Sequence, residues 1–141
     1  PGNLGTIIRT ADWFGIDQIV VSEDTAGLYN PKVIQSTMGS CFRVNLRSMD
    51  LETLLASNAK SKNKLPLYGA LLKGKSMHEI KWEPSNFILI GNESKGIREN
   101  LLSFISHPIS IPRTGEAESL NAAVATGIIL ANAKAYLNKL N

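Results

Sequence analysis

The pattern of apolar and polar positions predicts a helix at each end of the chain. The first helix has apolar residues three and four positions apart, at Leu4, Ile7, Ile8, Ala11 and Phe14, and it ends at Gly15. The second runs from about 119 to 140 and is small or apolar almost all the way round. Such a helix is expected to be buried on more than one side.

Short strands and helices alternate between these two helices. The predicted strands are runs of apolar and β-branched residues at 18–22, 42–46, 66–72, 86–90 and 107–111. Further helices are predicted after Asn30-Pro31, over 51–59 and over 98–104. The alternation predicts an α/β fold, a mostly parallel sheet with helices on both faces, formed by residues 1–141 as a single domain.

The composition is that of a globular protein, with 43% hydrophobic and 19% charged residues among 141. Cys41 is the sole cysteine, which excludes an internal disulfide and a multi-cysteine metal site, and we expect it to be a small buried residue. The sequence has no apolar run near the ~20 residues that span a bilayer. We therefore expect a cytoplasmic protein with no membrane partner.

The net charge of +3 is unevenly distributed. Residues 41–82 hold eight basic and three acidic side chains, and six of the basic ones are Lys60, Lys62, Lys64, Lys73, Lys75 and Lys81. These lysines could form one face that binds phosphates. Charge alone favours the simpler interpretation of a solvated loop and helix end.

Two turns that follow strands are candidate ligand sites, because ligands of parallel sheets bind at the carboxyl ends of the strands. In the first, Gly91 and Gly96 have the separation of a phosphate-binding Walker loop. Ile97 and Arg98 replace its lysine and serine or threonine, and the G-x-G-x-x-G pattern of dinucleotide sites is also absent. Spacing alone favours an ordinary strand-to-helix turn.

The second turn, 111–121, delivers small and polar residues to the start of the last helix. Free N–H groups at a helix start can bind a ligand, or they can be capped by side chains such as Glu118 or Ser119. The residues leave both interpretations open.

Three segments together resemble one family, the SpoU (TrmH-like) branch of the SPOUT RNA methyltransferases. Residues 3–15 resemble its first motif, 88–96 its second and 109–121 its third, in the right order and over nearly the whole chain. The resemblance implies a C-terminal deep trefoil knot, the SPOUT fold. It also implies that an N-terminal strand and helix, and any N-terminal RNA-binding domain, are missing before Pro1.

The resemblance implies that the chain binds S-adenosylmethionine and methylates a ribose 2′-hydroxyl of tRNA or rRNA. Matched position by position, the cofactor-binding residues would be Leu71, Gly91, Gly96, Ile111 and Leu120. Glycine at position 91 fits this role, since a missing Cβ lets a ligand approach the backbone. Arg113, Glu116 and Glu118 depart from the family pattern, with consequences expected for RNA preference and not for cofactor binding.

The catalytic residues implied by the resemblance are Arg9, Asn3, Glu93, Ser119 and Asn121. Arg9 matches the family's catalytic arginine. We favour a role in gripping phosphate and stabilising negative charge, because a guanidinium is effectively never deprotonated, while the role of general base stays open. From its position alone Arg9 could also be a surface residue near the end of a helix.

The remaining candidates have simpler explanations. His78 and His107 lie far apart and have no cysteine or carboxylate at ligand spacing, so no metal is expected. Trp13 and Trp82 could stack on bases, but Trp13 lies within the first motif, where core packing is the simpler prediction.

A homodimer is expected around the last helix, where Ala123, Gly127 and Ala131 repeat at four-residue spacing. The resemblance also implies dimers. The alternative function is a non-catalytic module that binds RNA or senses the cofactor and keeps the knot. The complete set of motif residues favours the enzyme.

Overall fold

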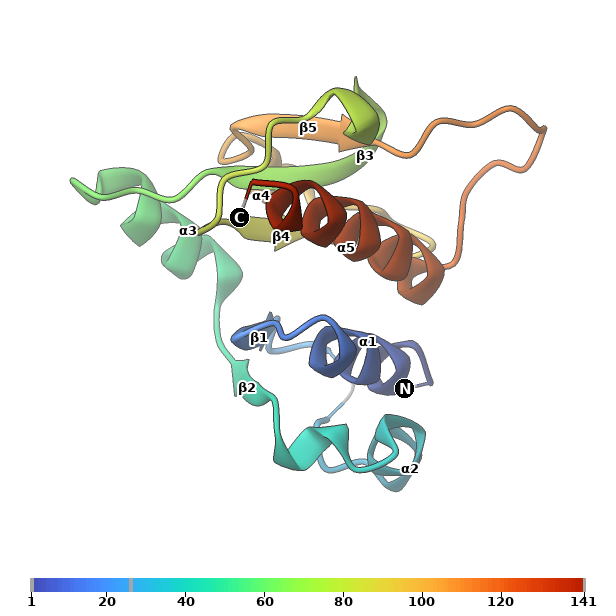
Figure 1. Ribbon diagram of the computed structural model, residues 1–141. Helices are drawn as coiled ribbons and strands as arrows, with labels where there is room; N and C mark the ends of the chain where they lie inside the picture. Colours follow the sequence, from blue (N-terminus) through green and yellow to red (C-terminus); the bar gives the residue numbers. More distant parts are fainter. Residues whose placement is uncertain (1, 26, 141) are drawn as a thin grey trace. The chain divides into compact units, whose positions relative to one another are not determined.

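The computed structural model describes residues 2–25 and 27–140. They form two compact units, Pro1–Leu51 and Glu52–Asn141, which we describe separately (Figure 1). No helix in the described part of the chain is long and apolar enough to cross a bilayer.

The first unit contains two helices, a two-stranded sheet and a short 3-10 helix. Its elements are α1 (Gly2–Trp13), β1 (Gln18–Val21), α2 (Pro31–Thr37), η1 (Ser40–Phe42) and β2 (Asn45–Ser48). Strands β1 and β2 pair in parallel. The α1 residues Leu4 and Ile8 are buried with Val33 of α2 and Val44, which precedes β2. The spacing-based prediction of the first helix is confirmed.

Helix α2 begins where the Asn30-Pro31 pair predicts. The Asn30 side chain accepts a hydrogen bond from the Lys32 backbone N–H at 2.9 Å, and Pro31 occupies the first turn. The helices α1 and α2 approach so closely that a Cβ at Gly5 would overlap the Ser36 side chain.

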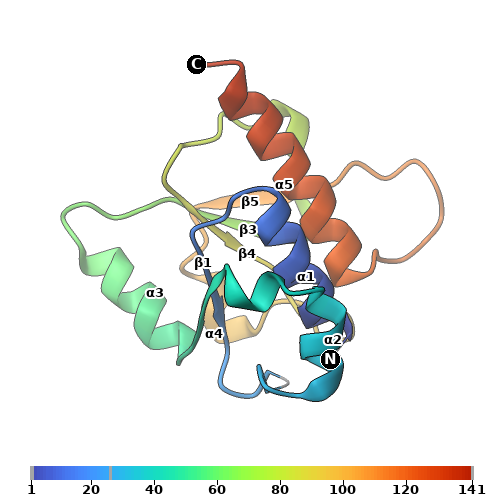
Figure 2. The same ribbon diagram turned by 60° about the horizontal axis from the view of Figure 1, so that its bottom comes forward.

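The second unit is built on a three-stranded parallel sheet in the order β4-β3-β5. Its elements are α3 (Leu51–Lys60), β3 (Leu67–Ser76), η2 (Met77–Glu79), β4 (Phe87–Leu89), α4 (Glu99–Leu102), β5 (His107–Ser110) and α5 (Ala122–Asn138). Helix α5 lies along this sheet in both views (Figures 1 and 2).

The two faces of this sheet are covered differently. On one face, Tyr68 of β3 and Ile109 of β5 are fully buried against Ile129 and other residues of α5. Gly69 follows Tyr68 and faces the opposite side, because strand side chains alternate. There a Cβ at Gly69 would overlap Ile105, which follows α4. The predicted α/β class and parallel strands are confirmed.

Three expectations need correction. The strand pairings define a two-stranded and a three-stranded sheet instead of one sheet. The segment predicted as a strand at 42–46 begins as η1, because the Arg43 and Val44 amides both donate to the Ser40 carbonyl; the strand follows at Asn45–Ser48. The last helix begins at Ala122, since Asn121 and not Glu118 or Ser119 is its N-cap.

Candidate functional site

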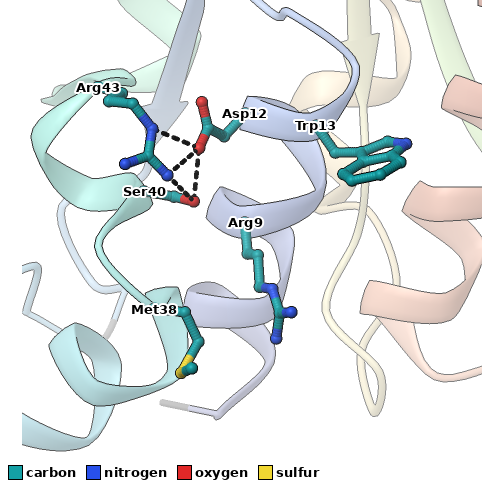
Figure 3. Close-up of a pocket in the computed structure, with 6 residues that line it drawn as sticks. All are labelled: Arg9, Asp12, Trp13, Met38, Ser40 and Arg43. Carbon is teal, nitrogen blue, oxygen red and sulfur yellow. Dashed lines mark hydrogen bonds and ion pairs between the residues drawn. The ribbon is translucent and has the colours of Figure 1, made fainter.

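The first unit contains a shallow pocket of about 410 Å³ beside α1 (Figure 3). Helix α1 supplies three side chains, the end of α2 supplies Met38, and η1 with its C-cap supplies the rest; the lining residues are Arg9, Asp12, Trp13, Met38, Ser40 and Arg43. Of these, Arg9 was a candidate catalytic residue from the sequence, and Trp13 was considered for stacking on bases. The pocket therefore surrounds the arginine that the resemblance implies to be catalytic.

A charged cluster forms the back of this pocket. One carboxylate oxygen of Asp12, Oδ2, accepts hydrogen bonds from Arg43 Nε at 2.9 Å, Arg43 Nη2 at 2.6 Å and Ser40 Oγ at 2.7 Å. The hydrogen bonds from Arg43, and then the one from Ser40, hold the pKa of the Asp12 carboxyl below its ordinary value. The same contact raises the pKa of Arg43. Both groups stay ionised and neutralise each other at neutral pH.

Arg9 is the unpaired cation of the pocket. Asp12 lies three residues after Arg9 on α1, a spacing at which opposite charges can pair. Its carboxylate is instead engaged by Arg43 and Ser40, and Arg9 makes no hydrogen bond or ion pair with any described residue. In Figure 3 the Arg9 guanidinium points away from that cluster. Arg9 is exposed and available to an anion.

The structure also places two other motif residues of α1, Asn3 and Trp13. Asn3 is half-buried in the first turn of the helix and does not line the pocket. The prediction that Trp13 packs in the core is wrong, because its side chain is 85% exposed. Trp82, in the second unit, is the buried tryptophan, and its indole N–H donates to Asn132 Oδ1 at 2.9 Å.

The turn after β4 is a tightly hydrogen-bonded loop. Asn92 and Gly96 exchange two backbone hydrogen bonds, of 3.0 and 2.8 Å, and Asn92 Oδ1 accepts from the Ser94 amide at 2.9 Å. Gly96 has a φ of 65°, which favours glycine. A Cβ at Gly91 would overlap the Gly96 backbone. The turn itself therefore requires glycine at position 91, in addition to any need for a ligand to approach the backbone there.

The second and third motifs meet at the start of α5. Glu93 Oε1 accepts hydrogen bonds from Asn121 Nδ2 at 2.6 Å and from the Ala122 amide at 3.3 Å. Asn121 Oδ1 accepts from the Ala123 and Val124 amides at 2.9 and 3.2 Å. These bonds satisfy orphan donors and place a carboxylate at the positive end of the helix dipole. Asn121 therefore caps the helix, the role for which the sequence suggested Glu118 or Ser119.

The loop between β5 and α5 is exposed and makes few bonds of its own. Figure 1 shows it extending from the sheet and returning to α5. Residues 112–120, which include Ser119 and the 45% exposed Leu120, are all exposed, and no backbone amide of 113–120 donates to a described residue. Arg113 Nη1 donates to the Ala117 carbonyl at 3.0 Å across the loop. The loop therefore offers free backbone donors.

Two other predicted cofactor contacts lie on the sheet. Ile111 is half-buried and packs against the core that α5 covers. Leu71 is half-buried and begins a bulge in β3, where Ala70 and Lys75 both pair with Ile109. Leu71 thus lies where the strand leaves the regular sheet, a place that commonly redirects side chains towards a site.

Several sequence candidates stay outside any site. His107 Nδ1 is 2.8 Å from Ser106 Oγ, and His78 Nδ1 is 3.2 Å from Asn132 Nδ2, so each has a polar partner at the surface. No cluster of His, Cys, Asp and Glu within the described ranges could hold a metal. Cys41 is free and half-buried rather than buried. The six lysines are all exposed, and no structural feature favours a phosphate-binding face over the simpler interpretation.

Asp12, Ser40 and Arg43 were missed by the sequence reasoning. Asp12 carried a signal, its position one turn from Arg9 on the same helix. Arg43 is 31 residues after Asp12 and carried no such signal, because only the fold of the first unit brings the two side chains together.

Comparisons with known proteins identify relatives of the chain. A sequence profile of the SpoU rRNA methylase family matches residues 1–131. The 23S rRNA (guanosine(2553)-2′-O)-methyltransferase RlmP of Bacillus subtilis is 37% identical over 131 residues, 92% of this chain and 52% of that protein.

Solved structures give the same result. The SpoU methyltransferase AviRb from Streptomyces viridochromogenes, in complex with AdoMet, has a TM-score of 0.88 and 30% identity, covering 99% of this chain and 57% of that one. An AdoMet-bound rRNA methyltransferase from Sinorhizobium meliloti has a TM-score of 0.88 and 32% identity, with 97% and 52% covered. The chain spans about half the length of each of these relatives.

Proposed function

The chain belongs to the SpoU rRNA methylase family, and we propose that it transfers a methyl group from S-adenosylmethionine to a ribose 2′-hydroxyl of tRNA or rRNA. The observation that carries this proposal is the state of Arg9. An exposed arginine without a protein partner, next to an acid that is neutralised by another arginine, is suited to an anionic substrate.

Groups of the second unit would hold the cofactor. Relatives with AdoMet bound support the choice of cofactor, and the chain offers free backbone amides at 113–120 with apolar side chains at Ile111 and Leu120. Leu71 would add a further apolar contact, and the rigid turn between Gly91 and Gly96 would hold its own backbone groups in place. S-adenosylmethionine supplies a methyl group on a positively charged sulfur.

The residues of the chain have to position the ribose and stabilise charge. A ribose hydroxyl is a weak nucleophile and loses its proton as it attacks, so orientation and electrostatic help are the main requirements. Arg9 would bind the adjacent phosphate and stabilise the developing negative charge. Ser119 has an exposed hydroxyl that can orient the ribose, while Asn3 would support Arg9 from the same helix.

Glu93 and Asn121 act mainly through the start of α5. Their side chains are bonded to each other and to the first amides of the helix. In this arrangement they would hold the exposed loop 112–120 at its end and so position Ser119 and Leu120.

We propose three further properties on the basis of family membership. The profile match includes both units, and we propose that they function as a single domain. The segment around β4, β5 and α5 would form the trefoil knot. A homodimer would form through α5. Of the predicted stripe, Ala131 is exposed and Gly127 half-buried, whereas Ala123 is buried within the chain and would not contribute to the interface.

Methyl transfer can be tested directly. The protein is incubated with labelled S-adenosylmethionine and total RNA from a strain that lacks it, and the modified nucleotide is mapped. Label in a ribose 2′-O-methyl group supports the proposal. RNA binding without any transfer would instead identify a non-catalytic binding module.

Cofactor binding should not need a metal. Since no described cluster could hold an ion, calorimetry with S-adenosylhomocysteine should give the same affinity with and without EDTA. Loss of binding on chelation would contradict this expectation.

A further inference from the structure

The pocket beside α1 combines a free cation with an exposed aromatic ring. Arg9 and Trp13 are four residues apart on one helix, so they share a face. The Trp13 side chain is 85% exposed and lines the same pocket as Arg9. An exposed tryptophan is unusual in a folded domain, because its burial would be strongly favourable.

The opposite side of the pocket holds a second exposed apolar side chain in an unfavourable backbone conformation. Met38 is 70% exposed and has φ 51° and ψ 39°, the left-handed region that residues with a Cβ rarely adopt. It is the sole non-glycine residue with positive φ in the described ranges. This conformation ends α2, because Met38 is the C-cap of that helix and its backbone N–H donates to the Gln35 carbonyl. In Figure 3, Met38 and Trp13 lie on either side of Arg9.

We infer that this pocket binds one nucleotide of single-stranded RNA, with its phosphate on Arg9 and its base stacked on Trp13. The inference rests on the proposed function, since it assigns the recognition of a nucleotide next to the methylated ribose. Stacking on aromatic rings and contact with arginine are the general means of holding unpaired nucleotides. Met38 supplies a polarizable apolar wall that adapts to different bases.

The charge and the volume of the pocket favour a nucleotide over a protein partner. Asp12 and Arg43 neutralise each other, so Arg9 gives the pocket one net positive charge. An apolar protein surface would cover Arg9 without pairing it, which is costly. A pocket of about 410 Å³ lies within the size range of small-molecule sites.

The two tryptophans allow a direct test by fluorescence. Trp82 is 3% exposed and bonded to Asn132, whereas Trp13 is exposed. An oligoadenylate of about eight nucleotides, added without cofactor, should quench the Trp13 emission and leave the Trp82 emission unchanged. In the Trp13→Ala variant the quenching should disappear, while the Trp82 spectrum reports that the second unit is folded.

Affinity measured with a labelled oligonucleotide provides the second readout. Trp13→Ala should weaken binding roughly 5- to 150-fold, the range reported for loss of one stacked base. Trp13→Phe should retain most of the affinity. The matched control is Tyr29→Ala, because Tyr29 is 88% exposed in the same unit and does not line the pocket; its affinity should equal that of the parent.

Salt dependence tests the phosphate contact. Arg9→Ala should make the slope of log affinity against log salt shallower by about 0.7, the value for one contact to a single strand. An unchanged slope would remove Arg9 from the proposed contact.

Other outcomes would overturn the inference. If Trp13→Ala binds RNA like Tyr29→Ala, or if Trp13→Ala turns a dimer into a monomer at unchanged RNA affinity, the exposed ring serves a protein interface. Because these titrations contain no cofactor, they are independent of methyl transfer. A protein that quenches and binds as expected but transfers no methyl group would contradict the proposed function and leave this inference in place.

Discussion

Arg9 and the start of α5 show two different uses of polar side chains. Arg9 has no partner among the described residues, although an acid lies one helical turn away. At the start of α5, Glu93 and Asn121 are bonded to each other, and both accept backbone N–H donors. The first arrangement keeps a charge available to a ligand, while the second uses polar groups to stabilise a helix end.

The difference predicts that substitutions in the two regions affect different properties. A side chain without protein partners contributes little to folding, so its loss should change binding or catalysis alone. Side chains that satisfy the amides of α5 contribute to stability first, and they affect the exposed loop through the helix end.

The largest expected effect is on catalysis, from Arg9→Ala. Removal of one preorganised charge-stabilising group typically lowers a rate about 10²- to 10³-fold. The free energy of unfolding should change by less than about 0.5 kcal/mol, because Arg9 is exposed and unpaired. Single-turnover methyl transfer and denaturant unfolding measure the two quantities.

Arg9→Lys is the control for geometry. It keeps the charge but loses the planar fork that binds phosphate with two hydrogen bonds, so little activity should return. Methyl transfer by Arg9→Ala at the rate of the parent protein would show that Arg9 is not catalytic.

A substitution in the turn after β4 should lower the stability of the protein, in contrast to substitution of Arg9. In Gly91→Ala, the added Cβ overlaps the Gly96 backbone, which cannot move without breaking the two bonds between Asn92 and Gly96. Overpacking of this kind costs about 1–3 kcal/mol of unfolding free energy. Gly115→Ala is the matched control, since nothing lies near a Cβ at that position. Equal stability of the two variants would contradict the structural explanation for Gly91.

Asn121→Ala should give a smaller loss of stability, because it removes the N-cap of α5. The variant loses the cap on the Ala123 and Val124 amides and the bond from Asn121 Nδ2 to Glu93, which keeps the Ala122 backbone amide as its donor. An N-cap of this type is worth about 0.5–2 kcal/mol. Ser119→Ala should change stability by less than about 0.5 kcal/mol, because Ser119 is exposed and makes no hydrogen bond with a described residue. Thermal unfolding of both variants would show whether Asn121 or Ser119 caps the helix.

Much of the fold was predictable because local signals determine it. The apolar spacing around Ile8 and the Asn30-Pro31 pair place α1 and α2 correctly, since both signals act within a few residues. The strand at 42–46 was misplaced because Phe42, Val44 and Leu46 alternate like a strand, whereas the bonds to Ser40 wind the first of them into η1.

The motif residues were predictable but their surroundings were not. Trp13 lies on a helix with a clear apolar pattern, yet burial depends on what packs against that face, which one sequence does not specify. Arg43 is recruited to Asp12 from 31 residues away. The sequence therefore predicted Arg9 as the candidate catalytic residue, but not the bond between Arg43 and Asp12 that leaves Arg9 without a protein partner.

The smallest expected effect is the pH dependence of the ion pair behind Arg9. The pKa of Asp12 is lowered in the folded protein by its bonds from Arg43 and Ser40, so the pair's stabilisation is fully present above the unfolded pKa of about 3.9 and is lost as the pH falls through the folded pKa. Asp12→Asn should therefore lower the melting temperature at neutral pH, and the difference from the parent should shrink below about pH 4. Asp17→Asn is the control, because Asp17 is exposed and bonds to no described residue. A different result would be an Asp12→Asn variant with the same melting temperature at neutral pH and the same rate of methyl transfer as the parent. In that case the bond from Arg43 does not keep Asp12 away from Arg9, and the lack of a partner for Arg9 needs another explanation.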